Sequence, residues 1–402
     1  MYPYHLGRQA GPIGGQQPTG LSLEHRLLPE HLQQRGYSTH MLGKWHLGFC
    51  RPEYLPTNRG FDTHYGFWNG AQDYYDKTVG GGRNKGYDFH DGLDVDMSAN
   101  GTYSEELYST RADRILRAHA QTSPSDPLFL YFAMQSSHTP LQAPQRYLDL
   151  YPGETNLNRT KFKAVVSAMD ETVGNLVQSL KDTGMYENSV ILFLGDNGGS
   201  SGQGASNFPL RGSKNSLWEG GVRTPAFLHS PLLASSTRTL NSLLHVTDWL
   251  PTLLRAAGAS LEQVGALGLD GMDQWEALTS PDTSTTKRQD MVINISLNRR
   301  NLTSAAYRLG DHKVVIRPGR KDGWDAKSGE QEPGPGLLPN QVLLFNIAED
   351  PQEREDLAST LPELRDQLVA KVEELRLTSL PVDDPAEVSG AVRDGVWVTG
   401  WC

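Results

Sequence analysis

The sequence predicts an α/β protein with a parallel or mixed sheet flanked by helices, followed by a small α+β domain. Apolar runs typical of buried strands alternate with amphipathic helical segments, which is the order expected of a parallel sheet. A polar, linker-like stretch at residues 279–287 follows, and the pattern after it becomes antiparallel. We therefore expect two domains, residues 1–287 and residues 288–402.

The elements of the first domain follow in order. Before Leu23 we expect neither helix nor strand. Residues 24–34 then form a helix ended by Gly36, and residues 37–42 a short strand. The run LFLYFAM at 128–134 is unbroken and apolar, which is typical of a strand buried on both faces. The other expected elements are helices at 104–120, 161–181 and 246–257, a buried strand at 189–194 and a further strand at 224–228.

The second domain opens with a hairpin signal. Two short strands, 305–309 and 313–317, flank the turn residues Gly310-Asp311-His312. A loop rich in glycine and proline then leads to a strand at 342–345 and a final helix at 361–377.

Composition excludes some classes of function. The 402 residues are 37% apolar, and the formal net charge of −10 argues against a general nucleic-acid binder. A few cations focused in a cleft would still attract an anionic substrate. No apolar run is long enough to span a membrane, and no signal peptide opens the chain. Four N-x-[ST] sequons favour a secreted glycoprotein: Asn100, Asn158, Asn294 and Asn301.

Three polar clusters stand just after predicted strands: Lys44-Trp45-His46, the SSHTP segment around His138, and Asp196-Asn197-Gly-Gly. Ligands of open parallel sheets bind outside the carboxyl ends of the strands, so the clusters are expected to meet in one crevice. Alone, Lys44 and His46 also fit an exposed loop, and His138 also fits a structural histidine at a strand end. Lys214, in the segment RGSK, is a fourth candidate, with a basic surface loop as its alternative.

Asp196 and Asn197 are the predicted metal ligands. A carboxylate and an amide carbonyl are hard oxygen donors, which suit Ca²⁺ or Mg²⁺ better than zinc. The alternative is a plain turn after a strand, because Asp, Asn and Gly dominate turns. Two ligands do not fill a shell of six or more, and the sequence offers no convincing further pair of acids.

The order of the motifs resembles the sulfatase family, and within it most closely the proteins similar to arylsulfatase B. GYSTHMLGKWHLG is followed by SSHTPLQAP, LFLGDNGG, LRGSKNSLWEGGVRTP, HVTDWLPTLL and LFNIAEDPQEREDLA in the family's order, across essentially the whole chain. The resemblance implies a fold like that of alkaline phosphatase and a sulfuric ester hydrolase. It implies that Lys44 and His46 contact sulfate, that His138 assists at the sulfate and the leaving oxygen, and that Lys214 bridges sulfate and nucleophile. Asp196 and Asn197 would then bind a divalent cation, usually Ca²⁺.

The family's nucleophile is a formylglycine made from the first residue of C/S-x-P-x-R. Cys50-Arg-Pro-Glu-Tyr54 imitates the start of that motif, but Tyr54 replaces the arginine and the order relative to GKWHLG is wrong. We therefore expect Cys50 to be an ordinary thiol, with no disulfide framework from Cys50 and Cys402. The residues after Met1 resemble the segment that follows the nucleophile, so we expect the printed chain to lack its N-terminal part, including the formylglycine precursor, a strand ending in two aspartates and a secretory signal.

The resemblance implies an aryl sulfate or sulfated glycan substrate, such as N-acetylgalactosamine 4-sulfate, and a lysosomal or secreted location for the full-length protein. The printed chain is expected to be inactive. Two alternatives remain open: a non-catalytic, glycan-binding relative of the sulfatases, and a phosphatase or phosphodiesterase of the same superfamily.

Overall fold

The computed structural model describes residues 1–402 except 234–237, 281–286, 298–302, 320, 327–330 and 339. The chain forms two compact units, each built from two separate stretches of sequence. Unit 1 contains Met1–Ala10 and Val190–Asp383, and unit 2 contains Gly11–Ser189 and Asp384–Cys402. Both units combine distant parts of the chain, and the predicted division between residues 287 and 288 stays a prediction.

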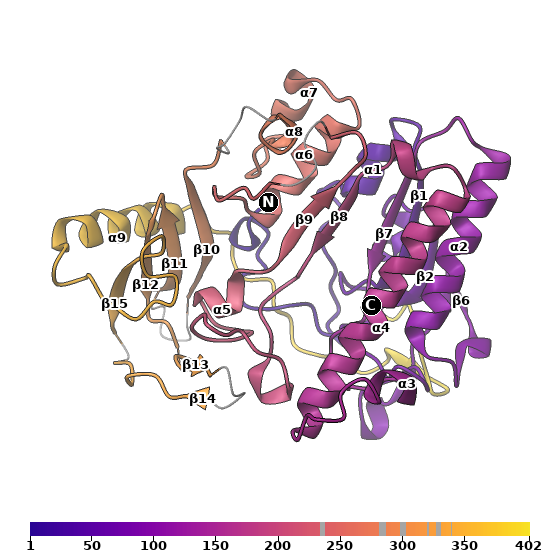
Figure 1. Ribbon diagram of the computed structural model, residues 1–402, viewed down its shortest axis with the longest axis horizontal. Helices are drawn as coiled ribbons and strands as arrows, with labels where there is room; N and C mark the ends of the chain where they lie inside the picture. The colour runs from indigo at the N-terminus through magenta and orange to yellow at the C-terminus, as the bar shows by residue number, and fades with distance from the viewer. Residues whose placement is uncertain (234–237, 281–286, 298–302, 320, 327–330, 339) are drawn as a thin grey trace. The chain divides into compact units, whose positions relative to one another are not determined.

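Unit 2 is built on a five-stranded sheet with the order β6-β5-β2-β1-β7. Figure 1 labels β6, β2, β1 and β7 among these strands. β1 (Ser38–Lys44) runs parallel to both of its neighbours, β2 (Thr63–Phe67) and β7 (Leu128–Ala133). β5 (His90–Asp91) and β6 (Asp94–Val95) extend the sheet with antiparallel pairing. The sheet is therefore mixed with a parallel centre, as the strand and helix order predicts.

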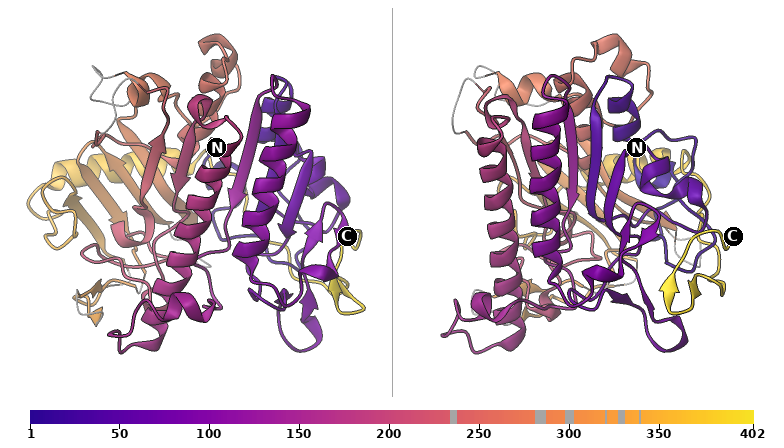
Figure 2. Two further views of the ribbon diagram at one scale, coloured as in Figure 1. Left: turned by 45° about the vertical axis from the view of Figure 1, so that its right-hand side comes forward. Right: turned by 90° about the vertical axis from the view of Figure 1, so that its right-hand side faces the viewer.

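Helices cover this sheet, and the two longest, α2 (Ser104–Thr122) and α4 (Leu157–Asp182), run side by side (Figure 2). α2 buries Tyr108, Ala112 and Ile115 in a cluster with Leu42 of β1. α1 (Leu28–Gln33) is shorter than predicted, because Pro29 stands in its first turn and the Glu30 carboxylate accepts the Leu27 N–H at 2.6 Å. α3 (Gln145–Leu148) completes the set in unit 2.

Two strands differ from the expectation of complete burial. β7 lies at the edge of its sheet, none of its residues is fully buried, and Tyr131 is 48% exposed. In unit 1, β8 (Ile191–Leu194) pairs antiparallel with β9 (Ala226–His229), and Leu194 is 39% exposed. An apolar run reports that a strand prefers burial, but the number of neighbouring strands decides whether it is buried.

Unit 1 contains the predicted antiparallel sheet, with the order β10-β11-β12-β15. Its strands are β10 (Asp290–Leu297), β11 (Thr303–Leu309), β12 (His312–Ile316) and β15 (Val342–Asn346). Leu309 pairs with His312, which confirms the hairpin predicted at Gly310. α9 (Pro362–Arg376) packs on this sheet through Leu368 and Val372 (Figure 1).

The N-terminal residues are more ordered than predicted. Pro3–His5 form a short 3-10 helix, and Tyr2 and Tyr4 are buried in the core cluster beneath the sheet of unit 1. The shorter elements of unit 1 are α5 (Glu219–Val222), α6 (Trp249–Ala256), α7 (Leu261–Gly265), α8 (Trp275–Thr279), β13 (Trp324–Asp325) and β14 (Gln331–Glu332).

A disulfide joins Cys50 to Cys402 within unit 2, so the expectation of an ordinary thiol at Cys50 is wrong. The segment that brings Cys402 there contains β16 (Val392–Arg393) and β17 (Val396–Trp397). These strands join β4 (Gly86–Tyr87) and β3 (Thr78–Val79) in a second small sheet. The two cysteines are 352 residues apart, so no local sequence pattern indicated that they would form a disulfide. Among the described helices, none combines the length and apolarity needed to cross a bilayer.

Candidate active site

In unit 2, Lys44 is the last residue of β1, and His46 follows two residues later. Gly43, with φ +91°, lies so close to β7 that a Cβ atom would stand 2.0 Å from the Ala133 carbonyl oxygen, and only glycine fits there. Trp45 between them is buried, and its indole N–H donates to the carbonyls of Gly48 and Tyr54, each at 3.0 Å. Lys44 and His46 are both half-buried, and the strand ends at Lys44, so whether the two side chains share a face stays a prediction.

His46 has a constrained backbone. Its φ of +58° is in the left-handed region, which is uncommon for a residue other than glycine. Its N–H donates to the Trp68 carbonyl at 3.1 Å, and Gly70 lies against the imidazole, where a Cβ atom would be 2.6 Å from Cε1. Such backbone conformations persist only where the surroundings enforce them, and they cluster at functional sites.

His138 lies in the loop after β7. Its Nδ1–H donates to the Thr139 carbonyl at 2.8 Å, so proton exchange with a ligand is left to Nε2. The hydroxyl of Tyr74 donates to the carbonyls of Gln135 and His138, at 3.2 and 3.0 Å, and holds the loop from the other side. β1 and β7 are parallel neighbours, with Gly43 opposite Ala133. Lys44, His46 and His138 therefore all lie at the carboxyl end of these strands.

The structure adds supporting residues that the sequence did not indicate. Glu105 of α2 is buried, which raises the pKa of its carboxyl, and Oε1 accepts the Ser136 hydroxyl at 2.5 Å in the loop that contains His138. Gln72, after β2, donates to the side chain of Gln135 at 3.3 Å. These contacts join segments far apart in sequence, so periodicity and motif spacing could not have found them.

Asp88 is the second residue that was missed. It is fully buried and accepts the backbone N–H groups of Trp68 and Asn69, at 3.1 and 2.9 Å. It also lies 3.1 Å from His90, whose ring stacks on Trp68 at 3.6 Å between centroids. Burial alone would raise the pKa of Asp88, but the hydrogen bonds from His90 and Asn69 outweigh it and lower the pKa. Asp88 therefore fixes the backbone of Trp68, just after β2, and the carbonyl of Trp68 accepts the N–H of His46.

In unit 1, Asp196 and Asn197 follow β8 and both are exposed. The Asn197 backbone N–H donates to Asp196 Oδ1 at 2.8 Å, and its side-chain nitrogen donates to the Gly198 carbonyl at 2.9 Å, so Asn197 Oδ1 is the amide atom suited to a cation. Gly198 lies where a Cβ atom would stand 1.8 Å from the Gly220 carbonyl oxygen. Close backbone packing therefore shapes this turn.

Lys214 belongs to the same part of unit 1. Its backbone N–H donates to the Gly199 carbonyl at 3.0 Å, which joins the lysine loop to the Asp196 loop. Three residues earlier in the chain, the Arg211 guanidinium lies over the rings of Trp218 and Trp324, 3.8 and 4.6 Å from their centroids. The structure thus brings together Asp196, Asn197 and Lys214 within unit 1, and Lys44, His46 and His138 within unit 2.

The predicted metal ligands fit Ca²⁺ by type, because both offer hard oxygens, but two donors do not fill its shell. Within the described ranges, no group of three or more His, Cys, Asp or Glu side chains is arranged to hold a metal ion. The cation therefore stays a prediction.

Three of the four sequons lie among the described residues, and Asn301 lies outside them. Asn100 and Asn158 are exposed. Asn294, in β10, donates from Nδ2 to the Gln9 carbonyl at 3.2 Å, and its Oδ1 is buried. A glycan on Asn294 would have to displace that hydrogen bond.

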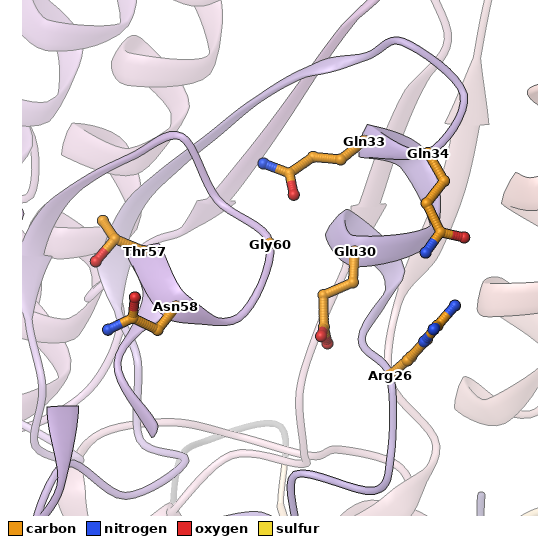
Figure 3. A pocket seen from close by; sticks show the side chains of 7 residues that line it. All are labelled: Arg26, Glu30, Gln33, Gln34, Thr57, Asn58 and Gly60. Atoms are coloured by element: carbon orange, nitrogen blue, oxygen red, sulfur yellow. The ribbon is translucent and has the colours of Figure 1, made fainter. Parts of the chain in front are cut away.

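A polar pocket lies elsewhere in unit 2, between α1 and the segment before β2 (Figure 3). Arg26 and Glu30 line one side, and Thr57 and Asn58 the other. Both walls precede the strands, so the pocket lies away from the carboxyl ends that present Lys44 and His46.

Comparison with known proteins identifies the family. The sulfatase family model matches residues 1–259. Arylsulfatase J of Mus musculus is 37% identical over 98% of this chain and 70% of its own length. N-acetylgalactosamine-6-sulfatase of the same organism is 28% identical over 87% of this chain and 68% of its own length.

A solved structure agrees with these relatives. The crystal structure of Ps i-CgsB in complex with k-i-k-neocarrahexaose superposes with a TM-score of 0.80 at 27% identity, covering 95% of this chain and 81% of that one. The residues 36–48, 136–144, 192–199 and 210–225, which contain the site candidates of both units, all fall inside the matched family region. The chain belongs to the sulfatase family of sulfuric ester hydrolases.

Proposed function

We propose that this chain binds the sulfate group of a sulfated sugar through Lys44, His46 and His138 of unit 2. Lys214 of unit 1 is proposed separately as a sulfate-binding residue, on the family resemblance of its segment. The observation that supports this most is the common position of the first three residues at one edge of the sheet of unit 2. An ammonium and two imidazoles offer several N–H donors to an oxyanion, and charge-assisted hydrogen bonds are the strong ones.

The chemistry of a sulfate ester explains the residue types. As the S–O bond breaks, negative charge grows on the leaving oxygen, and preorganised donors stabilise that charge. His138 is suited to protonate the leaving oxygen from Nε2, because its Nδ1–H is already bonded to the Thr139 carbonyl. Lys44, at the end of a strand, supplies a fixed positive charge.

We further propose that Asp196 and Asn197 bind Ca²⁺ or Mg²⁺ in the complete site. A divalent cation held there would supply positive charge for an anionic ligand. The fit in donor type supports this proposal, and the missing donors mean that no reaction step is assigned to the ion.

The printed chain is proposed to bind sulfate esters without hydrolysing them. It contains no C/S-x-P-x-R motif from which formylglycine could be made. Cys50, the residue that imitates its start, is fully buried and bonded to Cys402, so it offers no thiol for that modification. The same observations favour the second candidate function, a non-catalytic glycan-binding relative.

Sulfated glycans are the proposed substrate class, with N-acetylgalactosamine 4-sulfate as the first candidate. One relative is named for N-acetylgalactosamine 6-sulfate chemistry, and the structural neighbour binds a neocarrahexaose. The disulfide and the exposed sequons support a lysosomal or secreted location, because disulfides persist in oxidising compartments.

Two measurements on the purified chain test the proposal. Calorimetric titration with N-acetylgalactosamine 4-sulfate and 6-sulfate should show binding that weakens roughly tenfold or more in Lys44→Ala, since a charged partner is lost. Incubation with a chromogenic aryl sulfate and Ca²⁺ should give no turnover. Turnover that disappears in Cys50→Ala would contradict our interpretation of that cysteine, and tighter binding of phosphate than sulfate esters would favour a phosphatase relative.

A further inference from the structure

The C-terminal residues of the chain pack against the segment that contains Lys44 and His46. We define residues 384–402, which belong to unit 2, as the C-terminal strap. Its first part is joined to the start of the same unit: Gln17 Nε2 donates to Asp384 Oδ1 at 2.6 Å, and the Val388 N–H donates to the Gln16 carbonyl at 2.9 Å. The strap is thus hydrogen-bonded within unit 2 from its beginning.

Its last residues hold the segment that follows His46. Cys402 forms a disulfide with Cys50, and Cys50 stands four residues after His46 in the sequence. The Cys50 carbonyl accepts two strap N–H groups, from Gly400 at 2.8 Å and from Trp401 at 3.1 Å. One covalent bond and two hydrogen bonds therefore fix a single residue close to the candidate site.

Aromatic contacts lead from the strap to His46 itself. Trp397 is 3% exposed and meets Phe49 edge-to-face, with 5.9 Å between centroids. Phe49 packs on Trp68 at 5.7 Å, and the Trp68 carbonyl accepts the N–H of His46. Aromatic pairs of this kind contribute beyond the area that they bury.

The strap also supports Trp68 from a second direction. β17 pairs with β4 at Val396 and Tyr87, and the Tyr87 N–H donates to the Gly395 carbonyl at 2.7 Å. The next residue along the chain is Asp88, which accepts the N–H of Trp68. Both routes end on the residue that holds His46 in its left-handed conformation.

We propose that the C-terminal strap, through Trp397 and the Cys50–Cys402 disulfide, positions the Lys44–His46 segment for sulfate. Trp397 acts on this segment through Phe49 and Trp68, so it is a positioning residue. A left-handed residue relaxes when its surroundings loosen, and the surroundings of His46 include Trp68 and Gly70. This inference rests on the proposed sulfate-binding role of Lys44 and His46.

Hydrogen exchange of the full chain tests the proposal directly. The amides of Trp45 and His46 are hydrogen-bonded to Phe67 and Trp68, so their exchange reports the order of the segment. We expect their exchange to accelerate roughly tenfold or more in Trp397→Ala and in the double variant Cys50→Ser/Cys402→Ser, which leaves no free thiol. Trp397→Phe should restore protection, because a ring still meets Phe49.

The matched control is Ile115→Ala. Ile115 is buried on α2 in the cluster that contains Leu42, whereas Trp397 belongs to the cluster that contains the neighbouring β1 residue Met41. Adjacent strand residues face opposite sides of a sheet, so the control destabilises the same unit from the other face. Ile115→Ala should leave unchanged the ratio between the exchange rates of Trp45 and His46 and those of the β1 amides.

Titration with inorganic sulfate gives the second readout. Affinity should fall in Trp397→Ala and recover in Trp397→Phe. Unchanged exchange at Trp45 and His46 in both strap variants, or the same exchange pattern in Ile115→Ala, would overturn the proposal. If the parent chain bound no sulfate while the exchange pattern held, the proposed function would fail, and the strap would remain established as the element that orders this segment.

Discussion

Lys313 provides a sharp test of how unit 1 is held together. It is fully buried, and its ammonium lies 2.9 Å from Glu219 Oε1 and 2.8 Å from Glu353 Oε1. Glu353 Oε2 accepts the backbone N–H of Glu219 at 2.7 Å, and its carbonyl accepts Arg211 Nη1 at 2.9 Å. Arg211, three residues before Lys214, links this network to the lysine loop. We expect Lys313→Met to destabilise unit 1 strongly.

The magnitude follows from the charges that remain. Removing one partner of a buried ion pair costs about 3–5 kcal/mol, and here two carboxylates lose their cation, so we expect about 5 kcal/mol. For a unit of about 200 residues, this lowers the melting temperature by roughly 10–20 °C. Burial already raises the pKa of Glu353, and loss of Lys313 would raise it further. An acid with a raised folded-state pKa regains stability as pH falls, so the deficit of Lys313→Met should shrink toward pH 5.

Urea unfolding at pH 7.5 and pH 5, with thermal melts, measures both effects. Lys371→Met is the matched control, because the Lys371 side chain on α9 is 38% accessible and pairs with Glu374 at 2.8 Å, a surface contact worth under about 1 kcal/mol. The triple variant Lys313→Met/Glu219→Leu/Glu353→Gln should recover most of the lost stability, because no buried charge stays unpaired. The side-chain amide introduced at position 353 still offers an oxygen that accepts the backbone N–H of residue 219. A deficit of Lys313→Met below about 1 kcal/mol at pH 7.5, with the parent's pH dependence, would refute this reasoning.

Three further predictions concern other parts of the molecule. If Asp196 and Asn197 bind Ca²⁺ as proposed, Ca²⁺ should raise the melting temperature of the parent chain, and Gly198→Ala should abolish that shift, because its Cβ atom would meet the Gly220 carbonyl. Gly202→Ala, with open space around it, is the control, and an unchanged shift in both variants would contradict the role of this turn. Burial lowers the pKa of His64 and of His245 to about 4, below the unfolded value near 6.5. Stability should therefore be lost as pH falls from 6.5 through 4, by up to about 3 kcal/mol for each histidine. In thermal melts, His64→Phe should reduce this dependence of the melting temperature on pH, and an unchanged dependence would argue against burial of His64 as its cause. Glu105→Ala should cost about 1–3 kcal/mol by removing the acceptor of Ser136, whereas Glu105→Gln should keep most of the stability in urea unfolding; equal losses would show that the hydrogen bond is unimportant.

Local pattern determined much of this protein. The alternation of strands and helices predicted β1, β7, α2 and α4, and the turn signal at Gly310 predicted the hairpin of β11 and β12. The rule that parallel strands end at one edge placed Lys44 and His46 with His138. These features depend on residues close in sequence, or on one general property of sheets, so a single sequence was enough.

Only the tertiary structure decided the rest. It turned β7 into an edge strand, paired β8 with β9 antiparallel, and showed that Asp88 and Glu105 support the loops of the candidate site. It also bonded Cys50 to Cys402 across 352 residues, where the sequence had suggested a free thiol. Each of these depends on which distant segments become neighbours. Local periodicity reports how a residue prefers to be buried, whereas the packing of the whole chain decides which residue it meets.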